Sequence, residues 1–214
     1  MLSRCSLVLA VVACLAGCAS NPAYQAKLPQ LGENCVQQFD AVKRTPLRPL
    51  DAKSRDKQPY IEFADVAQCL STTAGSTPLA LYAIEAISPP AQIQISILPS
   101  AGGTFAAAVE LLDAKFQRIE RHPFTAFTRR GSEYSLSLFV NDAVPAYVML
   151  VPDDAQVGKR ETMVGSINNQ IIVPAGPMLF LFNNGAEIKP MRAFMAGGRL
   201  KVSIRQEGSA AFYR

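Results

Sequence analysis

His122 is the residue best suited to acid–base chemistry in this chain, because it is the only histidine among the 214 residues. A serine or cysteine nucleophile activated by histidine would therefore have to use it. Proline at position 123 favours extended backbone at His122, and no Gly-x-Ser-x-Gly elbow is present to supply a nucleophile. The sequence predicts a histidine in a surface loop and no catalytic residue.

Paired carboxylates are the next candidates, because two of them facing one pocket could hydrolyse a glycosidic bond. Asp153 and Asp154 are adjacent, and side chains of sequence neighbours usually point apart. Acidic residues also suit the start of a helix, so we expect one over 153–164. Glu110 and Asp113 end a predicted strand, and nothing in the sequence places them in a pocket. We expect no enzyme, and the chain has no phosphate-binding or dinucleotide-binding motif, so we expect no cofactor.

The N-terminus reads as an export signal ending at a cysteine. Arg4 precedes a short apolar run over 7–15, which is too short to span a bilayer. Leu15-Ala16-Gly17-Cys18 resembles the bacterial lipobox, whose cysteine accepts a diacylglyceryl group. The alternative is an ordinary secretory signal with Cys18 near the cleavage site by chance.

The lipobox implies a protein attached to a membrane through acyl chains on Cys18 rather than through a transmembrane helix. Ala19 follows that cysteine. By resemblance to Gram-negative lipoproteins, which stay at the inner membrane when aspartate stands there, we expect outer-membrane anchoring with the domain facing the periplasm.

Two cysteines remain once Cys5 and Cys14 leave with the signal and Cys18 takes the lipid. Cys35 and Cys69 are an even pair in an oxidising compartment, which predicts one disulfide. Two free buried thiols are the alternative. Two cysteines and one histidine are too few for a zinc site, so we expect no metal.

Composition divides the chain into a signal over 1–17, a lipidated tether over 18–58 and a folded domain over 59–214. The tether is rich in proline and charge and has poor apolar periodicity. The net charge of +4 is small and its basic residues are scattered, so nucleic acid is not an expected partner.

The folded domain shows the pattern of an antiparallel β-sandwich. Four segments alternate apolar and polar residues with period two, which predicts strands with one solvated face: 92–98, 104–112, 132–140 and 199–205. The outward charges of the last segment suggest a protected sheet edge. Three segments are continuously apolar, as central strands often are: 79–87, 146–151 and 178–182. At most one or two short helices are expected.

A sugar site usually combines aromatic faces with hydrogen-bonding side chains. Tyr82, Tyr134 and Tyr147 are the candidate ligand residues, although tryptophan is absent. The last two fall on inward faces of predicted strands, where core packing is the alternative explanation.

Three segments of the chain resemble the maltose operon periplasmic protein family. They are the string Phe-Ala-Ala-Ala-Val-Glu-Leu-Leu-Asp-Ala-Lys-Phe-Gln-Arg from Phe105 with the Pro-Phe pair at 123–124 and Phe127, the strand at 146–151, and the segment 198–202. Their order is that of the family, and the match covers about 60–205. The stretch 165–190 departs from the family pattern.

The resemblance implies an exported, non-enzymatic protein associated with carbohydrate transport, and it brings no ligand residues with it. We therefore expect a lipid-anchored accessory or binding component, with maltodextrin as ligand. The alternative is an envelope interaction protein with no sugar ligand.

Overall fold

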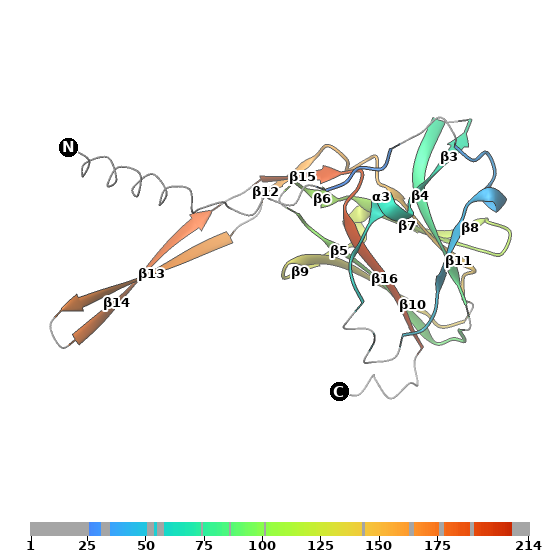
Figure 1. The fold of residues 1–214 in the computed structure, drawn as a ribbon. Coiled ribbons are helices and arrows are strands. Elements are labelled where there is room, and N and C mark those ends of the chain that lie inside the picture. The colour runs from blue at the N-terminus through green and yellow to red at the C-terminus, as the bar shows by residue number, and fades with distance from the viewer. Residues whose placement is uncertain are drawn as a thin grey trace, which may run out of the picture.

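The computed structural model describes residues 26–30, 35–50, 54, 58–73, 75–85, 87–100, 102–142, 144–162, 165–175, 178–188 and 191–206. These residues form a mainly β protein in which two sheets pack as a sandwich (Figure 1). The predicted fold class is confirmed.

The first sheet has the order β1-β4-β11-β7-β8, with β3 also paired to β4. Neighbouring strands are antiparallel except β1 and β4, which are parallel. Within the described residues its strands are β1 (Arg44–Leu47), β3 (Gln68–Thr72), β4 (Gly75–Ile84), β7 (Ala107–Leu112), β8 (Arg118–His122) and β11 (Tyr147–Pro152).

The second sheet is antiparallel and has the order β2-β16-β5-β10-β9. Its strands are β2 (Ile61–Glu62), β5 (Ala91–Leu98), β9 (Thr128–Arg130), β10 (Glu133–Val140) and β16 (Arg199–Gln206). The predicted strands at 92–98, 132–140 and 199–205 thus appear almost with their expected bounds, because period-two alternation fixes which face of a strand is buried.

The core fills the space between the two sheets. Ile93, Ile95 and Ile97 of β5 are 0% exposed and pack with the inward residues of the first sheet, such as Val109 and Leu150. Burying these side chains contributes roughly 1.5–3 kcal/mol each. The inward set of the predicted segment 104–112 is also as expected, although Ala106 divides the segment into β6 (Thr104–Phe105) and β7.

Smaller elements complete the fold. β6 joins β12 (Arg160–Thr162) and β15 (Met191–Met195) in a three-stranded sheet. β13 (Gly165–Ala175) and β14 (Met178–Ile188) form a hairpin that extends away from the sandwich (Figure 1). The described helices are short: α3 (Phe63–Val66) and the 3₁₀ turns η1 (Phe39–Ala41) and η2 (Phe124–Ala126).

The helix predicted over 153–164 is wrong. Residues 154–158 form turns and residues 160–162 form β12. Gly158 has φ +85°, a left-handed conformation that ends any helical path and that glycine adopts without steric cost. The carboxylate of Asp153 accepts a hydrogen bond from the Phe124 backbone N–H at 2.9 Å, so Asp153 supports η2 instead of a helix of its own.

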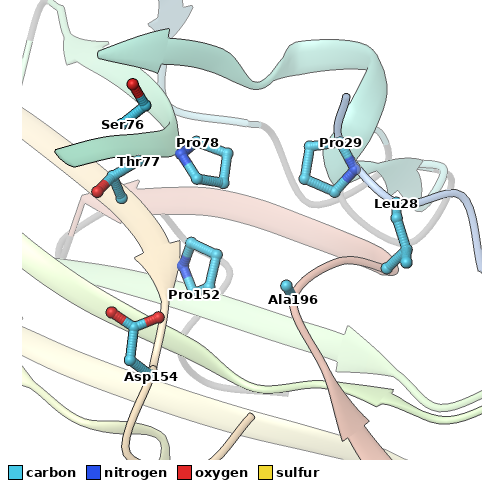
Figure 2. A pocket seen from close by; sticks show the side chains of 8 residues that line it. All are labelled: Leu28, Pro29, Ser76, Thr77, Pro78, Pro152, Asp154 and Ala196. Atoms are coloured by element: carbon cyan, nitrogen blue, oxygen red, sulfur yellow. The ribbon is translucent and has the colours of Figure 1, made fainter. Parts of the chain in front are cut away.

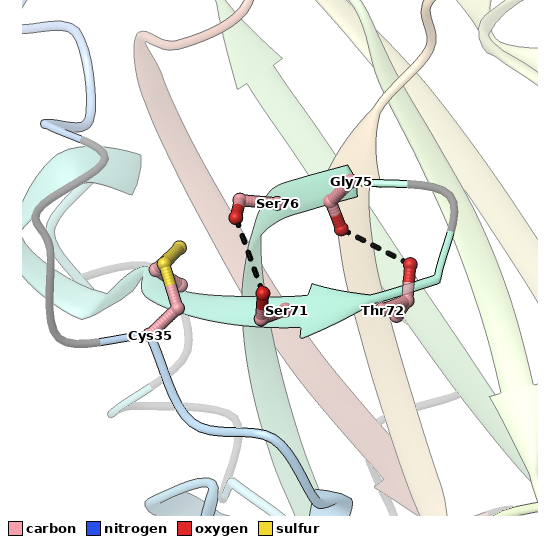
Figure 3. The surroundings of a disulfide bond; sticks show 6 residues. Cys35, Ser71, Thr72, Gly75 and Ser76 are labelled. Carbon is pink, nitrogen blue, oxygen red and sulfur yellow. Dashed lines mark hydrogen bonds between the residues drawn. A yellow bond between two sulfur atoms is a disulfide. The ribbon is translucent and has the colours of Figure 1, made fainter.

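The segment 18–58, predicted to be a tether, is folded onto the sandwich over 35–50. β1 pairs with β4, and Val36 forms a bridge with Leu70 of β3. The predicted disulfide joins Cys35 to Cys69 with a Cα–Cα distance of 4.6 Å (Figure 3). Backbone pairing and the disulfide hold this segment in place although it has little apolar periodicity, the property on which the prediction of a spacer rested. The predicted lipidation site, Cys18, lies outside the described residues, as do 1–17.

Two strand positions also differ from expectation. β16 is not an edge strand, because β2 pairs with its start and Pro49 forms a bridge with Ile204 near its end. The segment 178–182 lies in β14, which pairs with β13 and not with the sandwich in the part of the chain that the structure describes. The other two segments predicted as central, 79–87 and 146–151, lie in β4 and β11, and both strands have neighbours on either side.

Candidate functional site

The face of the first sheet that points away from the core is apolar. Leu79 and Leu81 of β4, Met149 and Val151 of β11 and Leu112 of β7 are buried there in a second hydrophobic cluster. Residues 36–42 lie over this face, with Val42 only 3% exposed. The disulfide to Cys69 fixes the start of this covering segment.

The covering segment leaves part of the face open as a groove. A cavity of about 240 Å³ lies where Phe39 meets Leu79, Met149 and the charged pair Glu110 and Arg121. The floor is apolar and one wall is charged. Such a combination of apolar surface with a few convergent polar groups is typical of small-molecule sites.

Glu110 supplies the charge in this groove. Its side chain comes from β7, is only 7% exposed, and accepts hydrogen bonds from Arg121 Nη1 at 2.8 Å and Arg118 Nη1 at 3.4 Å. Both arginines come from β8, which is paired with β7. Two guanidinium groups therefore compensate one nearly buried carboxylate, and they retain donors for a ligand.

A second cavity of about 290 Å³ adjoins the groove and shares Thr77, Pro152 and Asp154 with it. Figure 2 shows that its walls come from distant parts of the chain: Leu28, Pro29, Ser76, Thr77, Pro78, Pro152, Asp154 and Ala196. The two cavities are therefore neighbours, separated by shared wall residues of β4 and the end of β11.

An aromatic cluster also includes Phe39 of the covering segment. The ring centroids of Phe39 and Phe116 are 5.6 Å apart, and those of Phe116 and Tyr147 are 4.7 Å apart, with interplanar angles of 13° and 16°. The guanidinium carbon of Arg44 lies 5.2 Å from the Phe116 centroid and 5.5 Å from that of Tyr147. Because Phe39 belongs to both features, the groove and this aromatic cluster are contiguous.

Phe116 is held in its place by a tight turn between β7 and β8. Its φ of +60° is left-handed, which costs of order 1–3 kcal/mol for a residue with a bulky side chain. The Asp113 carboxylate accepts hydrogen bonds from the backbone N–H groups of Lys115 and Gln117, each at 2.8 Å, and so imposes this turn. Backbone strain that persists at this half-buried aromatic residue marks it as a candidate functional position.

The three tyrosines predicted as ligand residues are not brought together. Tyr147 lies in the aromatic cluster on the outer face of the first sheet. Tyr82 and Tyr134 are only 4% and 5% exposed and pack into the core between the sheets. Their rings therefore present no open face for stacking on a sugar, although the side chain of Tyr82 also borders a third cavity, of about 220 Å³.

Burial has a clear electrostatic effect on these two core tyrosines. Desolvation raises the pKa of Tyr82 above its ordinary value, and within the described residues its hydroxyl has no hydrogen-bond partner. Desolvation and a hydrogen bond to the Glu161 carboxylate raise the pKa of Tyr134. Both hydroxyls therefore stay protonated across the physiological range.

His122 is the last residue of β8, not part of a loop as predicted, and it pairs with Val109. Its Nε2 lies 3.3 Å from the Glu120 carboxylate, on the same strand. Neither partner is a nucleophile, so this arrangement provides no triad. Over the described ranges, no group of three or more His, Cys, Asp or Glu side chains could hold a metal ion.

Sequence reasoning did not select Phe39, Arg44 or Phe116 as site residues. Phe39 and Arg44 lie in the segment assigned to a tether, and Phe116 follows a predicted strand as an isolated aromatic. One signal was present in the sequence. Phe116 follows Asp113 in the short connection between β7 and β8, and an aromatic residue in such a turn is less often part of the core.

Comparisons of the chain with protein-family models, with curated proteins and with solved structures gave no match. Among the helices that the structure describes, none has the length and apolar character needed to cross a bilayer.

Proposed function

We propose that this protein is a non-enzymatic, lipid-anchored protein of the bacterial outer membrane whose sandwich domain faces the periplasm and binds a carbohydrate, with maltodextrin as the ligand class. The observation that carries the binding role is the aromatic cluster contiguous with a groove that contains the Glu110–Arg121 pair. The family resemblance of the sequence supplies the choice of maltodextrin.

The anchor in this proposal rests on the lipobox at Cys18. Lys27 forms an ion pair with Asp65 at 2.5 Å, and Pro29 packs close to Gly197, so residues 26–30 already belong to the body. Eight peptide bonds join Cys18 to Ala26. They span at most roughly 26 Å. The acylated cysteine would therefore hold the domain close to the membrane surface.

A pyranose ring has apolar faces and hydroxyl-bearing edges, so its binding sites pair aromatic rings with charged or amide groups. The aromatic cluster provides rings on an accessible surface, and Arg44 provides a cation beside them. The groove provides Arg121 and Glu110 a short distance along the same face. An oligosaccharide could contact both features, whereas the inner face of the sheet is closed by core packing.

Titration calorimetry on the full chain, extracted from membranes in a detergent without a sugar headgroup, tests this proposal. Maltotriose and longer maltodextrins should bind, and unrelated glycans should not. Phe116→Ala and Tyr147→Ala should each weaken binding by about 3- to 10-fold, the loss expected for one aromatic contact.

Phe139→Ala is the matched control, because Phe139 is 65% exposed on β10 of the second sheet, whereas the site lies on the outer face of the first sheet. It should leave the affinity unchanged. No heat of binding at millimolar maltodextrin would contradict the sugar ligand, and a chain absent from the membrane fraction would contradict the anchor. Thermal unfolding of each variant without ligand separates lost binding from lost folding.

The alternative function, an envelope interaction protein with no sugar ligand, is favoured by one separate feature, the hairpin β13–β14. Its projection from the sandwich suits contact with another chain.

A further inference from the structure

The cavity of about 220 Å³ that borders Tyr82 is lined by the end strands of both sheets. β1 ends the first sheet and β2 ends the second, and each contributes residues to its wall. β4 of the first sheet and β16 of the second complete the wall. None of its lining residues lines the groove that we propose to bind sugar, so this cavity is a separate feature of the sandwich.

Most of the cavity wall is aliphatic. Five of its residues are proline or branched aliphatic: Pro46, Leu47, Pro59, Ile61 and Val202. An apolar cavity of about 150 Å³ is large enough to hold benzene, whereas one water molecule takes up only about 30 Å³ of the liquid. A cavity of about 220 Å³ therefore has room for a six-membered ring, and its aliphatic wall favours an organic molecule over a group of waters.

Two buried polar atoms of the wall residues have no hydrogen-bond partner within the described part of the chain. They are the hydroxyl of Tyr82 and Oε1 of Gln58. Gln58 Nε2 donates to the Val202 carbonyl at 2.9 Å, which orients the amide and leaves its oxygen as the unpaired acceptor. A tyrosine hydroxyl can donate, and an amide oxygen can only accept. One hydroxyl group that accepts from Tyr82 and donates to Gln58 would therefore pair both atoms.

Packing of the core does not require the hydroxyl of Tyr82. The residue is 4% exposed, and its ring belongs to the core between the sheets. Phenylalanine would fill the same core space without burying an unpaired polar atom, which is unfavourable. Buried polar groups in native proteins are nearly always paired. An unpaired hydroxyl on a residue that lines a cavity therefore indicates a ligand that pairs with it.

The charge at this cavity is already compensated. Among the described residues that line it, Lys201 alone is charged. Its ammonium nitrogen lies 5.0 Å from the centroid of the Tyr60 ring, and Tyr60 is not a lining residue. A cation held against an aromatic face is stabilised by the ring quadrupole. The cavity therefore does not require an anionic ligand, and a neutral one fits its wall.

We propose that this cavity binds a small neutral alcohol, with an apolar body of about six to eight carbon atoms and one hydroxyl group. The hydroxyl accepts a hydrogen bond from Tyr82 and donates one to Gln58 Oε1, while the apolar body lies against the aliphatic wall. A sugar does not suit this cavity, because its remaining hydroxyl groups would be desolvated against aliphatic side chains. The site goes beyond the proposed function, and its occupancy does not depend on maltodextrin.

Methyl NMR of the full chain in phospholipid nanodiscs tests the proposal, with cyclohexanol as the probe and isoleucine δ1-methyl groups as reporters. The methyl group of Ile61 should shift and saturate with a Kd of about 1 mM or lower, a reasonable affinity for a ligand of this size. Ile119, which is 62% exposed on β8, reports non-specific effects and should not shift. Glycerol, which has no apolar body, should leave both methyl groups unchanged.

Tyr82→Phe removes the hydroxyl and keeps the ring, so it should weaken cyclohexanol binding by about 3- to 10-fold, the loss expected for one hydrogen bond. Tyr134→Phe is the matched control, because the Tyr134 hydroxyl donates to Glu161 and this residue does not line the cavity. It should leave the affinity unchanged. Thermal unfolding of each variant without ligand confirms that it is folded.

An Ile61 methyl group that does not saturate at ten times the expected Kd would overturn the proposal, and so would equal affinity of the wild type and Tyr82→Phe. If cyclohexanol does not bind and a long-lived water shows an Overhauser effect to the Tyr82 ring, water alone fills the cavity and the alcohol site is refuted. Maltodextrin binding at the groove is measured separately, so failure of one proposal leaves the other standing.

Discussion

The outer face of the second sheet carries Gln92 and Gln94 on β5 and Lys201 on β16, whereas the outer face of the first sheet carries Leu81, Met149 and other buried apolar residues. One face is polar and meets water. The other is covered by residues 36–42, which the disulfide ties to β3. Both sheets contribute their inner faces to one core, so they differ only in their outer faces: that of the first sheet is apolar and needs to be covered, and that of the second is polar.

This difference explains where a candidate site can form. A solvated polar face has no apolar groove to offer, while a face that needs a cover leaves cavities where the cover stops. The groove and the aromatic cluster both border Phe39 of the covering segment, and the adjoining cavity borders Leu28 and Pro29. The short covering segment thus both buries apolar surface and borders the candidate binding surface of the first sheet.

Removing the disulfide should have the largest effect on this comparison. The Cys35→Ser/Cys69→Ser variant should lose about 3–4 kcal/mol of unfolding free energy, the value expected for a loop closed over 34 residues. Denaturant unfolding with and without reductant measures the loss. Hydrogen exchange should speed up first in β3, β4 and β11, below the cover. Equal acceleration in β5 and β10 would show that the two faces are not independent.

A matched pair of substitutions compares the two outer faces directly. Met149→Ser should cost about 2–4 kcal/mol, because Met149 is 6% exposed beneath the cover and its loss creates a cavity. Phe139→Ser on the second sheet should change stability by less than about 0.5 kcal/mol, because Phe139 is 65% exposed. Chemical denaturation of both variants provides the numbers. Similar costs for the two changes would contradict the assignment of a covered and a solvated face.

The smallest expected effect concerns the inner face of the first sheet and is visible only at high pH. Desolvation raises the pKa of Tyr82 in the folded state, so between its unfolded value near 10 and its folded value only the unfolded chain releases the proton. Stability is therefore intact below pH 10 and falls as the pH rises above it. The slope is about 1.4 kcal/mol per pH unit for one such tyrosine.

Tyr82→Phe should reduce this alkaline slope and change stability at pH 7 by less than about 1 kcal/mol, because the hydroxyl has no hydrogen-bond partner in the described part of the chain. Part of the slope should persist, since burial and Glu133 raise the pKa of Tyr60 to about 12. Denaturant unfolding at pH 7, 10 and 11 measures both values. An unchanged slope in the variant would show that Tyr82 is not desolvated.

Much of the fold was predictable from local patterns. The alternation in 92–98, 132–140 and 199–205 predicted β5, β10 and β16, because a strand with one buried face must repeat every two residues. The helix over 153–164 failed because the acidic pair and a basic pair suited a helix, while the left-handed Gly158 and the hydrogen bond of Asp153 to Phe124 favoured turns. The local sequence around Asp153 gives no information about its hydrogen-bond partner, which is 29 positions away in the chain.

The candidate site was less predictable. Tyr147 was selected for its residue type and lies in the aromatic cluster, but Tyr82 and Tyr134 were selected for the same reason and lie in the core. Period two alone cannot tell which face of a sheet meets a second sheet when both faces are apolar. Phe39 contacts Phe116 only because the covering segment packs on the outer face of the first sheet, and these two residues lie far apart in the chain.

The sequence by itself determined the β-sandwich class, most strand positions and the pairing of Cys35 with Cys69, because residue periodicity and cysteine number are local or countable properties. The tertiary structure alone decided that residues 35–50 cover a sheet rather than form a spacer, that β16 is not an edge, and that the apolar segment 178–182 lies in β14, which does not pair with the sandwich in the described part of the chain. These outcomes depend on which segments bury which apolar faces, and such contacts join residues that are far apart in the chain.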